Sequence, residues 1–278
     1  MTAPNFEVVQ MTPEWAQHLL ANQNGHNRKI KTRHVTYLAE SIKRGEWKLT
    51  SQGIAIGNNG QLLDGQHRLA AIRDAGQTVP ILLATECDPS IFTVIDTGSK
   101  RSTGDTLYLL GAPQHNQAAA AIRLIMLAKT QKTGSWANSK MIFSNEQIQQ
   151  YYLQDQLRID TYVRLVYNAV KNFKMVNRGA LTAFCILTLD REHFSHTVEN
   201  FVQALTTGAN LPHDSAVLAF RNAIVNRSIF GERGGTTVQQ LWVSCLTKCF
   251  NDWYLERSLK VFKAPKQMPE IAHNVFPA

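Results

Sequence analysis

Residues 60–76, GQLLDGQHRLAAIRDAG, contain the most informative pattern of the sequence. The apolar pair Leu62 and Leu63 leads into Asp-Gly-Gln-His-Arg at positions 64–68, and the residues that follow have the spacing of a short helix that ends at Gly76. The first backbone N–H groups of a helix lack intrahelical partners and carry partial positive charge, so they bind anions, and phosphate above all. The stretch therefore predicts a strand, a phosphate-binding turn and a helix.

The residues of this turn suit phosphate chemistry. Gly65 lets the backbone approach a ligand closely, and Arg68 offers a bidentate fork of N–H donors. His67 can donate, accept or shuttle a proton, and Asp64 can hold a magnesium ion against phosphates. The alternative is that Asp64 only caps the helix while Arg68 is a solvated surface residue. The residues alone leave both interpretations open.

Helix and strand patterns alternate through the first hundred or so residues, whereas the rest of the chain has helical spacing throughout. The fold class predicted is α+β, with an N-terminal α/β domain over residues 1–111 and an all-helical domain over 112–278. The elements predicted before residue 111 are a helix capped by Thr12, a second helix capped by Thr32 that stops at Gly45, a hairpin around Asn58-Asn59-Gly60, a strand over 77–87 and a strand that begins at Ile91.

Three of these segments together resemble the ParB/sulfiredoxin superfamily. The helix LAESIKRGEW (38–47) resembles the family's L-x-x-S-I-x-x-x-G element, residues 65–71 resemble its G-E-R-R-x-x-A-A motif, and TVPILLA (78–84) resembles the strand that follows. In NGHNRKI (24–30), Arg28 is placed like the arginine of the family's first box. Gln66 stands where sulfiredoxins have their reactive cysteine, which argues against reduction of sulfinic acids.

The resemblance implies a nucleotide site at the turn. In that reading Arg68 and the backbone of Gly65 and Gln66 hold the phosphates of a nucleoside triphosphate, CTP or ATP, with Arg28 nearby. Mg²⁺ would accompany the nucleotide, with Asp64 as a ligand, and His67 would do acid–base work. The motif DGQHR looks closest to the motif of ParB-like proteins from phages and mobile elements, so the resemblance also implies a DNA-related role.

A second cluster follows in VIDTGSKRSTGD (94–105), and it has two interpretations. Asp96 and Arg101 could close over the phosphates, with Lys100 and Arg101 in a phosphate-binding nest of Gly and Ser. In the alternative, Asp96 caps a turn and Ser102 or Thr103 caps the next helix.

The composition favours a polyanionic partner. The net charge is +8 with a pI of about 9.4, and RLVYNAVKNFKMVNRGA (164–180) mixes Arg, Lys and Tyr so that it could touch a DNA backbone. A solvated helix face explains that segment equally well. Cys245 and Cys249, four residues apart, are expected to pack in a core, and His193 and His196 are expected at the surface or as caps.

The N-terminal residues lack the pattern of a signal peptide, and no apolar run has the length of a membrane helix, so a cytoplasmic protein without membrane contact is expected. The first hypothesis for function is a ParB-like nucleotide-binding protein whose helical domain engages DNA or a protein. The second is a metal-dependent nuclease that uses Asp64, His67 and Asp96. The third is an interaction protein that keeps the fold as a scaffold. The sequence leaves the oligomeric state open, with a homodimer as one option.

Overall fold

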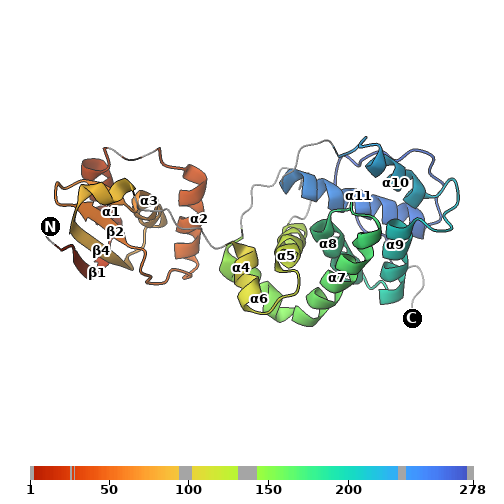
Figure 1. Ribbon diagram of the computed structural model, residues 1–278, viewed down its shortest axis with the longest axis horizontal. Helices are drawn as coiled ribbons and strands as arrows, with labels where there is room; N and C mark the ends of the chain where they lie inside the picture. The colour runs from red at the N-terminus through yellow and green to blue at the C-terminus, as the bar shows by residue number, and fades with distance from the viewer. Residues whose placement is uncertain are drawn as a thin grey trace. The chain divides into compact units, whose positions relative to one another are not determined.

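The computed structural model describes residues 3–25, 27, 29–93, 102–130, 143–230 and 236–273. The chain divides into two compact units, Met1–Lys100 and Arg101–Ala278, and the predicted mixed α+β class is confirmed (Figure 1). The predicted boundary at residue 111 would place helix α4 (Thr103–Leu109) in the first unit, whereas α4 lies within the second.

A four-stranded sheet forms the centre of the first unit, in the order β1-β4-β2-β3. Strand β1 (Asn5–Met11) runs antiparallel to β4 (Val79–Cys87), β4 runs parallel to β2 (Ile54–Gly57), and β2 forms the predicted hairpin with β3 (Leu62–Asp64). Strand β1 was not predicted from the sequence. It lies at the edge of the sheet, and its sequence NFEVVQM contains four apolar residues, of which only Met11 is buried.

Three helices pack with this sheet: α1 (Pro13–Gln23), α2 (Thr32–Lys43) and α3 (Gln66–Ala75) (Figure 1). The predicted Thr12 cap is confirmed, because its Oγ1 accepts a hydrogen bond from the Trp15 N–H at 3.1 Å. The predicted cap of α2 is wrong, since Thr32 is the first helical residue and Lys31 is the cap position. The side chains buried between helices and sheet include Met11, Leu19, Ile42, Ile54, Leu69, Ile72 and Ile81.

The strand predicted from Ile91 is wrong over the residues that can be compared. Pro89–Thr93 form a short 3-10 helix, η1, whose start is held by a hydrogen bond from the Ser90 N–H to Asp88 Oδ1 at 2.9 Å. An Asp two residues before a backbone N–H favours this turn over an extended strand. The rest of the predicted strand lies outside the described residues.

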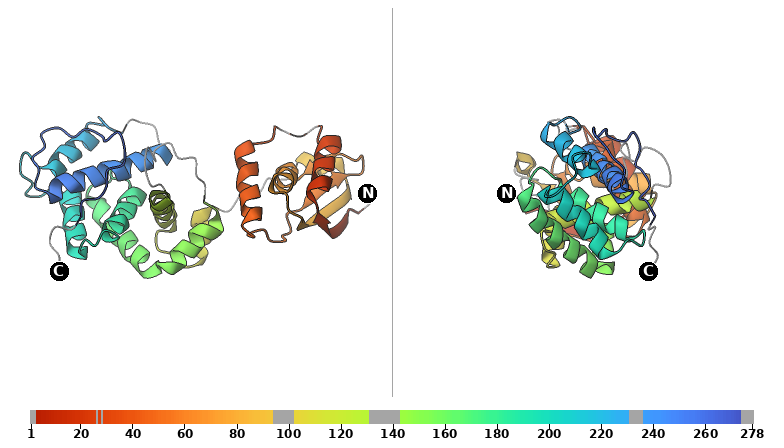
Figure 2. Two further views of the ribbon diagram at one scale, coloured as in Figure 1. Left: turned by 180° about the vertical axis from the view of Figure 1, so that it is seen from behind. Right: turned by 90° about the vertical axis from the view of Figure 1, so that its right-hand side faces the viewer.

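The second unit is built around α8 (Arg178–Leu189), which packs against α5, α7, α9 and α11 (Figures 1 and 2). Nearly every α8 side chain is buried, which explains why its sequence, RGALTAFCILTL, is apolar on all sides. The other elements are α4, α5 (His115–Thr130), α6 (Asn145–Gln154), α7 (Gln156–Ala169), η3 (Val170–Asn172), α9 (Ser195–Thr207), α10 (Ala216–Val225) and α11 (Thr236–Tyr254).

Cysteines and a histidine contribute to the core of the second unit. Cys245 and Cys249 are buried, as predicted, and so is Cys185. His193, in contrast, is not at the surface: it is 4% exposed, packs edge-on against Phe250 and Tyr254, and bonds through Nε2 to the Ala272 carbonyl at 2.6 Å. The His193 ring therefore has a packing role between two aromatic side chains. The sequence spacing between His193 and His196 could not indicate this role.

Within the described ranges, none of the helices is long and apolar enough to cross a membrane.

Candidate phosphate-binding site

The turn between β3 and α3 depends on Gly65. Its backbone has φ 101° and ψ 4°, a left-handed conformation that residues with a Cβ rarely adopt. A Cβ added there would lie 2.4 Å from Ile54 Cδ1 and 3.2 Å from Ile54 Cα, both in neighbouring strand β2. Glycine is therefore required for conformation and for space, and it lets α3 begin directly against the sheet.

Asp64 and Arg68 form an ion pair across this turn. The Gly65 N–H donates to Asp64 Oδ1 at 2.6 Å, and Arg68 Nη2 donates to Asp64 Oδ2 at 2.8 Å. The side chains are partly exposed, 29% for Asp64 and 18% for Arg68. Arg68 makes no other hydrogen bond within the described part of the chain, so its remaining N–H donors can reach a ligand.

His67 joins the start of α3 to the start of α2. The Lys31 N–H donates to His67 Nε2 at 3.0 Å, so this ring nitrogen accepts and carries no proton in that contact. Lys31 and Gly65 are the N-cap residues of the two helices, and neither supplies a side-chain acceptor to its helix. The partly positive ends of two helices thus meet at one histidine, an arrangement that attracts an anion more strongly than one helix alone.

The segment that leads into α2 is basic and is tied to the same turn. Asn27 Nδ2 donates to the Leu62 carbonyl at 2.5 Å, which fixes the segment against β3. Lys29, Lys31 and Arg33 are exposed along it. Sequence reasoning missed Lys31 because its contact with His67 spans 36 residues. Helix periodicity is a local signal and cannot report such a distance.

Gln66 is turned inward. Its side chain is 5% exposed, and its Oε1 accepts a hydrogen bond from Asn24 Nδ2 at 3.3 Å. Asn24 Oδ1 is itself buried without a hydrogen-bond partner. Any contact of Gln66 with a ligand must therefore come from its backbone, as the resemblance implies, while its side chain fixes the end of α1 to the start of α3.

Arg28, Asp96, Lys100 and Arg101 lie outside the described residues, and their placement beside the turn stays a prediction. The nuclease hypothesis needs Asp96 and therefore also stays a prediction.

The turn fits a phosphate group better than a protein-bound metal. Magnesium in nucleotide sites is held by one or two carboxylates together with phosphate oxygens. Among the described residues, no group of three or more His, Cys, Asp or Glu side chains could hold a metal. Both oxygens of Asp64 accept a hydrogen bond, from the Gly65 N–H and from Arg68.

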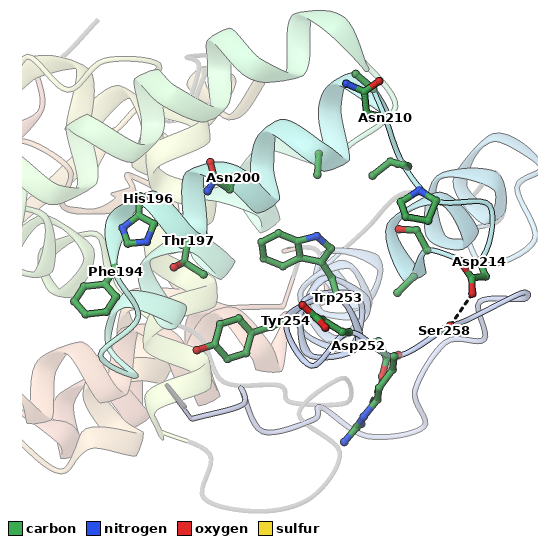
Figure 3. Close-up of a pocket in the computed structure, with 18 residues that line it drawn as sticks. Phe194, His196, Thr197, Asn200, Asn210, Asp214, Asp252, Trp253, Tyr254 and Ser258 are labelled. Atoms are coloured by element: carbon green, nitrogen blue, oxygen red, sulfur yellow. Dashed lines mark hydrogen bonds and ion pairs between the residues drawn. The ribbon is translucent and has the colours of Figure 1, made fainter. Parts of the chain in front are cut away.

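The second unit has a separate cleft of about 880 Å³ between α9, the α9–α10 connection and the end of α11 (Figure 3). Trp253 forms part of its wall, half-buried rather than fully in the core. Two acids of the wall are engaged: Asp252 pairs with Lys248 at 2.5 Å, and Asp214 accepts from Ser258 Oγ at 2.7 Å. The Ser258 hydrogen bond lowers the pKa of Asp214, which favours the ionised carboxylate and not a proton donor.

Comparison of the chain with protein-family models, curated proteins and solved structures found no match.

Proposed function

We propose that the first unit binds the phosphate groups of a nucleoside triphosphate at the start of α3. The observation that carries the proposal is the meeting of two helix starts at His67, next to a partly exposed arginine with unused donors. The resemblance of residues 65–71 to the ParB/sulfiredoxin motif suggests a nucleotide as the source of the phosphate, with CTP and ATP as the candidates.

Each residue has a separate role in the proposal. The backbone at Gly65 and Gln66 approaches the phosphates, and Arg68 donates from the side of the turn. His67 keeps the two helix starts together through its bond to the Lys31 N–H. Mg²⁺ would enter with the nucleotide, bound chiefly by phosphate oxygens, because Asp64 is engaged by Arg68.

Arg68→Ala tests the site, and Arg73→Ala is its matched control. Both arginines lie on α3 and both pair with an aspartate, Arg68 with Asp64 and Arg73 with Asp74. A hydrogen bond to a charged group contributes about 1.5–3 kcal/mol, so loss of Arg68 should weaken phosphate binding roughly 10- to 100-fold. Arg73, in the last turn of the helix, should leave the affinity unchanged.

The measurement is titration calorimetry of the full chain with ATP, CTP, ADP and pyrophosphate, each with and without Mg²⁺. Melting temperatures recorded in parallel should rise with any ligand that binds only the folded state. If none of these compounds binds, or if both arginine variants lose affinity equally, the proposal is wrong. Cleavage of plasmid DNA by the wild type, with loss of cleavage in Asp64→Ala, would favour the nuclease hypothesis instead.

A further inference from the structure

A basic surface lies in the second unit, where α7 passes through η3 into α8. Residues 161–189 contain no Asp or Glu. Arg164, Lys171, Lys174 and Arg178 in this stretch all have exposed side chains. These four residues, with the half-buried Tyr167 among them, are called the basic patch below.

Two cations of the basic patch, Lys171 and Arg178, lie over the ring of Tyr167. Lys171 Nζ lies 5.2 Å from the centre of the Tyr167 ring, and Arg178 Cζ lies 5.0 Å from it. Arg164 precedes Tyr167 by three residues on α7, a spacing that makes them neighbours on one helix face. A cation over an aromatic ring is held in place by the negative face of the ring, so the positive charges are positioned before any partner arrives.

The turn that carries the basic patch is fixed to the core. Val170 and Val176 are buried on either side of it. The Arg221 guanidinium of α10 lies 4.2 Å from the centre of the Phe173 ring, and the same side chain donates to the Leu205 carbonyl. Binding at this turn would require little ordering of the backbone, which lowers its entropic cost.

The charge of the basic patch is not neutralised by acids within the described part of the chain. Its four cations form no ion pair there, whereas Arg158 on the same helix pairs with both Asp155 and Asp190. The nearest acid before the patch in sequence, Asp160, accepts a hydrogen bond from the Tyr152 hydroxyl at 2.9 Å. Neighbouring α5 and α10 contain no acid at all.

The excess positive charge of the whole chain also belongs to this unit. Residues 101–278 contain 19 Lys and Arg against 12 Asp and Glu, while residues 1–100 contain 10 against 9. Clustered cations without acids attract polyanions at long range and bind their phosphates directly.

We propose that the basic patch binds the phosphate backbone of a polynucleotide. An exposed row of cations along a helix, a turn and the next helix start suits successive phosphates of a strand better than a single small anion. Recognition through phosphates is independent of base sequence and depends strongly on salt. This binding does not require the nucleotide site of the first unit.

The test compares two triple variants of the full chain with equal loss of charge. The first is Lys171→Gln, Lys174→Gln and Arg178→Gln, which removes three cations of the basic patch. The control is Lys260→Gln, Lys263→Gln and Lys266→Gln, in the C-terminal segment of the same unit. Fluorescence anisotropy measures binding to labelled double-stranded DNA, single-stranded DNA and single-stranded RNA, each about 25 nucleotides long, over a range of salt concentrations.

The wild type and the control should bind at least one of these polynucleotides at low salt. The basic-patch variant should bind it at least tenfold more weakly. For double-stranded DNA, the slope of log affinity against log salt should fall by roughly 2–3, because each phosphate that the protein neutralises contributes about 0.9 to that slope. No binding by the wild type to any polynucleotide, or equal weakening in the two variants, would overturn the proposal. Polynucleotide binding is measured without nucleotide or Mg²⁺, and nucleotide binding by the wild type is measured separately, so failure here and failure of the nucleotide proposal are separate results.

Discussion

Gly65→Ala tests whether the β3–α3 turn is specified by backbone conformation and space together. The substitution adds one methyl group at a residue with φ 101°, directed at the side chain of Ile54. Gly76→Ala is the matched control at the other end of the same helix. Gly76 also has positive φ, 67°, but an added Cβ there meets no atom within 4 Å.

The difference between the two variants isolates the cost of overlap with Ile54. A Cβ in the left-handed region costs roughly 1–2 kcal/mol at either position. Loss of glycine also reduces the entropy of the unfolded chain, which offsets about 0.4–1 kcal/mol in both variants. Only Gly65→Ala forces a methyl group against Ile54, which is 1% exposed and whose backbone Cα would lie 3.2 Å from the added carbon. Overpacking of this kind costs about 1–3 kcal/mol, so Gly65→Ala should be less stable than Gly76→Ala by that amount.

Hydrogen–deuterium exchange read by mass spectrometry is the appropriate assay, because peptides from β2 and α3 report on the first unit alone. A single melting transition of a two-unit chain does not define one free energy of unfolding. Exchange in these peptides should be about 5- to 150-fold faster in Gly65→Ala than in Gly76→Ala. Equal exchange rates in the two variants would refute the reasoning, since they would mean that Ile54 yields to the added methyl without cost.

Three further outcomes follow from the contacts of individual groups. Asp64→Asn removes the negative charge that competes with a phosphate for Arg68. This variant should therefore bind pyrophosphate more tightly than the wild type in a calorimetric titration without Mg²⁺. Weaker binding would contradict this reasoning and would show that Asp64 mainly positions Arg68. Burial raises the pKa of the Cys245 thiol to about 12 and the pKa of the Cys249 thiol well above its ordinary value. Neither thiol should therefore react with a thiol reagent at neutral pH until the chain is unfolded in guanidinium. Burial also raises the pKa of Tyr152 to about 12 from 10.0. As the pH rises, the unfolded chain therefore loses this proton before the folded chain does, and the free energy of unfolding should fall between those two values. Tyr152→Phe should make urea unfolding less dependent on pH in that window, and an unchanged dependence would contradict the assignment.

The elements around the candidate site were predictable because their signals are local. Asn58-Asn59-Gly60 indicated the hairpin, and Gly76 indicated the end of α3, where it adopts the left-handed conformation expected of a C-terminal glycine. Two elements of the first unit, β1 and η1, were not predicted, and both depend on specific contacts. Strand β1 is held by its pairing with β4, and η1 by the hydrogen bond from the Ser90 N–H to the Asp88 side chain.

Single residues of the site were predictable, but their pairing was not. The sequence placed Asp64, His67 and Arg68 on one turn, because they follow one another at the end of β3 and the start of α3. It could not place Lys31 beside His67 or Asn24 beside Gln66, since these contacts depend on how α1 and α2 pack onto α3. The convergence of two helix starts, on which the proposed function depends, is a tertiary feature.

The position of Asp64 also gives a physical answer to the two interpretations that the sequence left open. Its carboxylate accepts hydrogen bonds from the Gly65 N–H and from Arg68, a backbone amide and a guanidinium of the kind that bind phosphate oxygens. A helix cap would instead bond the backbone N–H of the second or third helical residue. Asp64 therefore acts as an internal counter-ion of Arg68 and not as a helix cap. Under the proposed function a phosphate would compete with this carboxylate for Arg68, while the shape of the turn depends on the positive φ of Gly65 and on the lack of space for a Cβ beside Ile54.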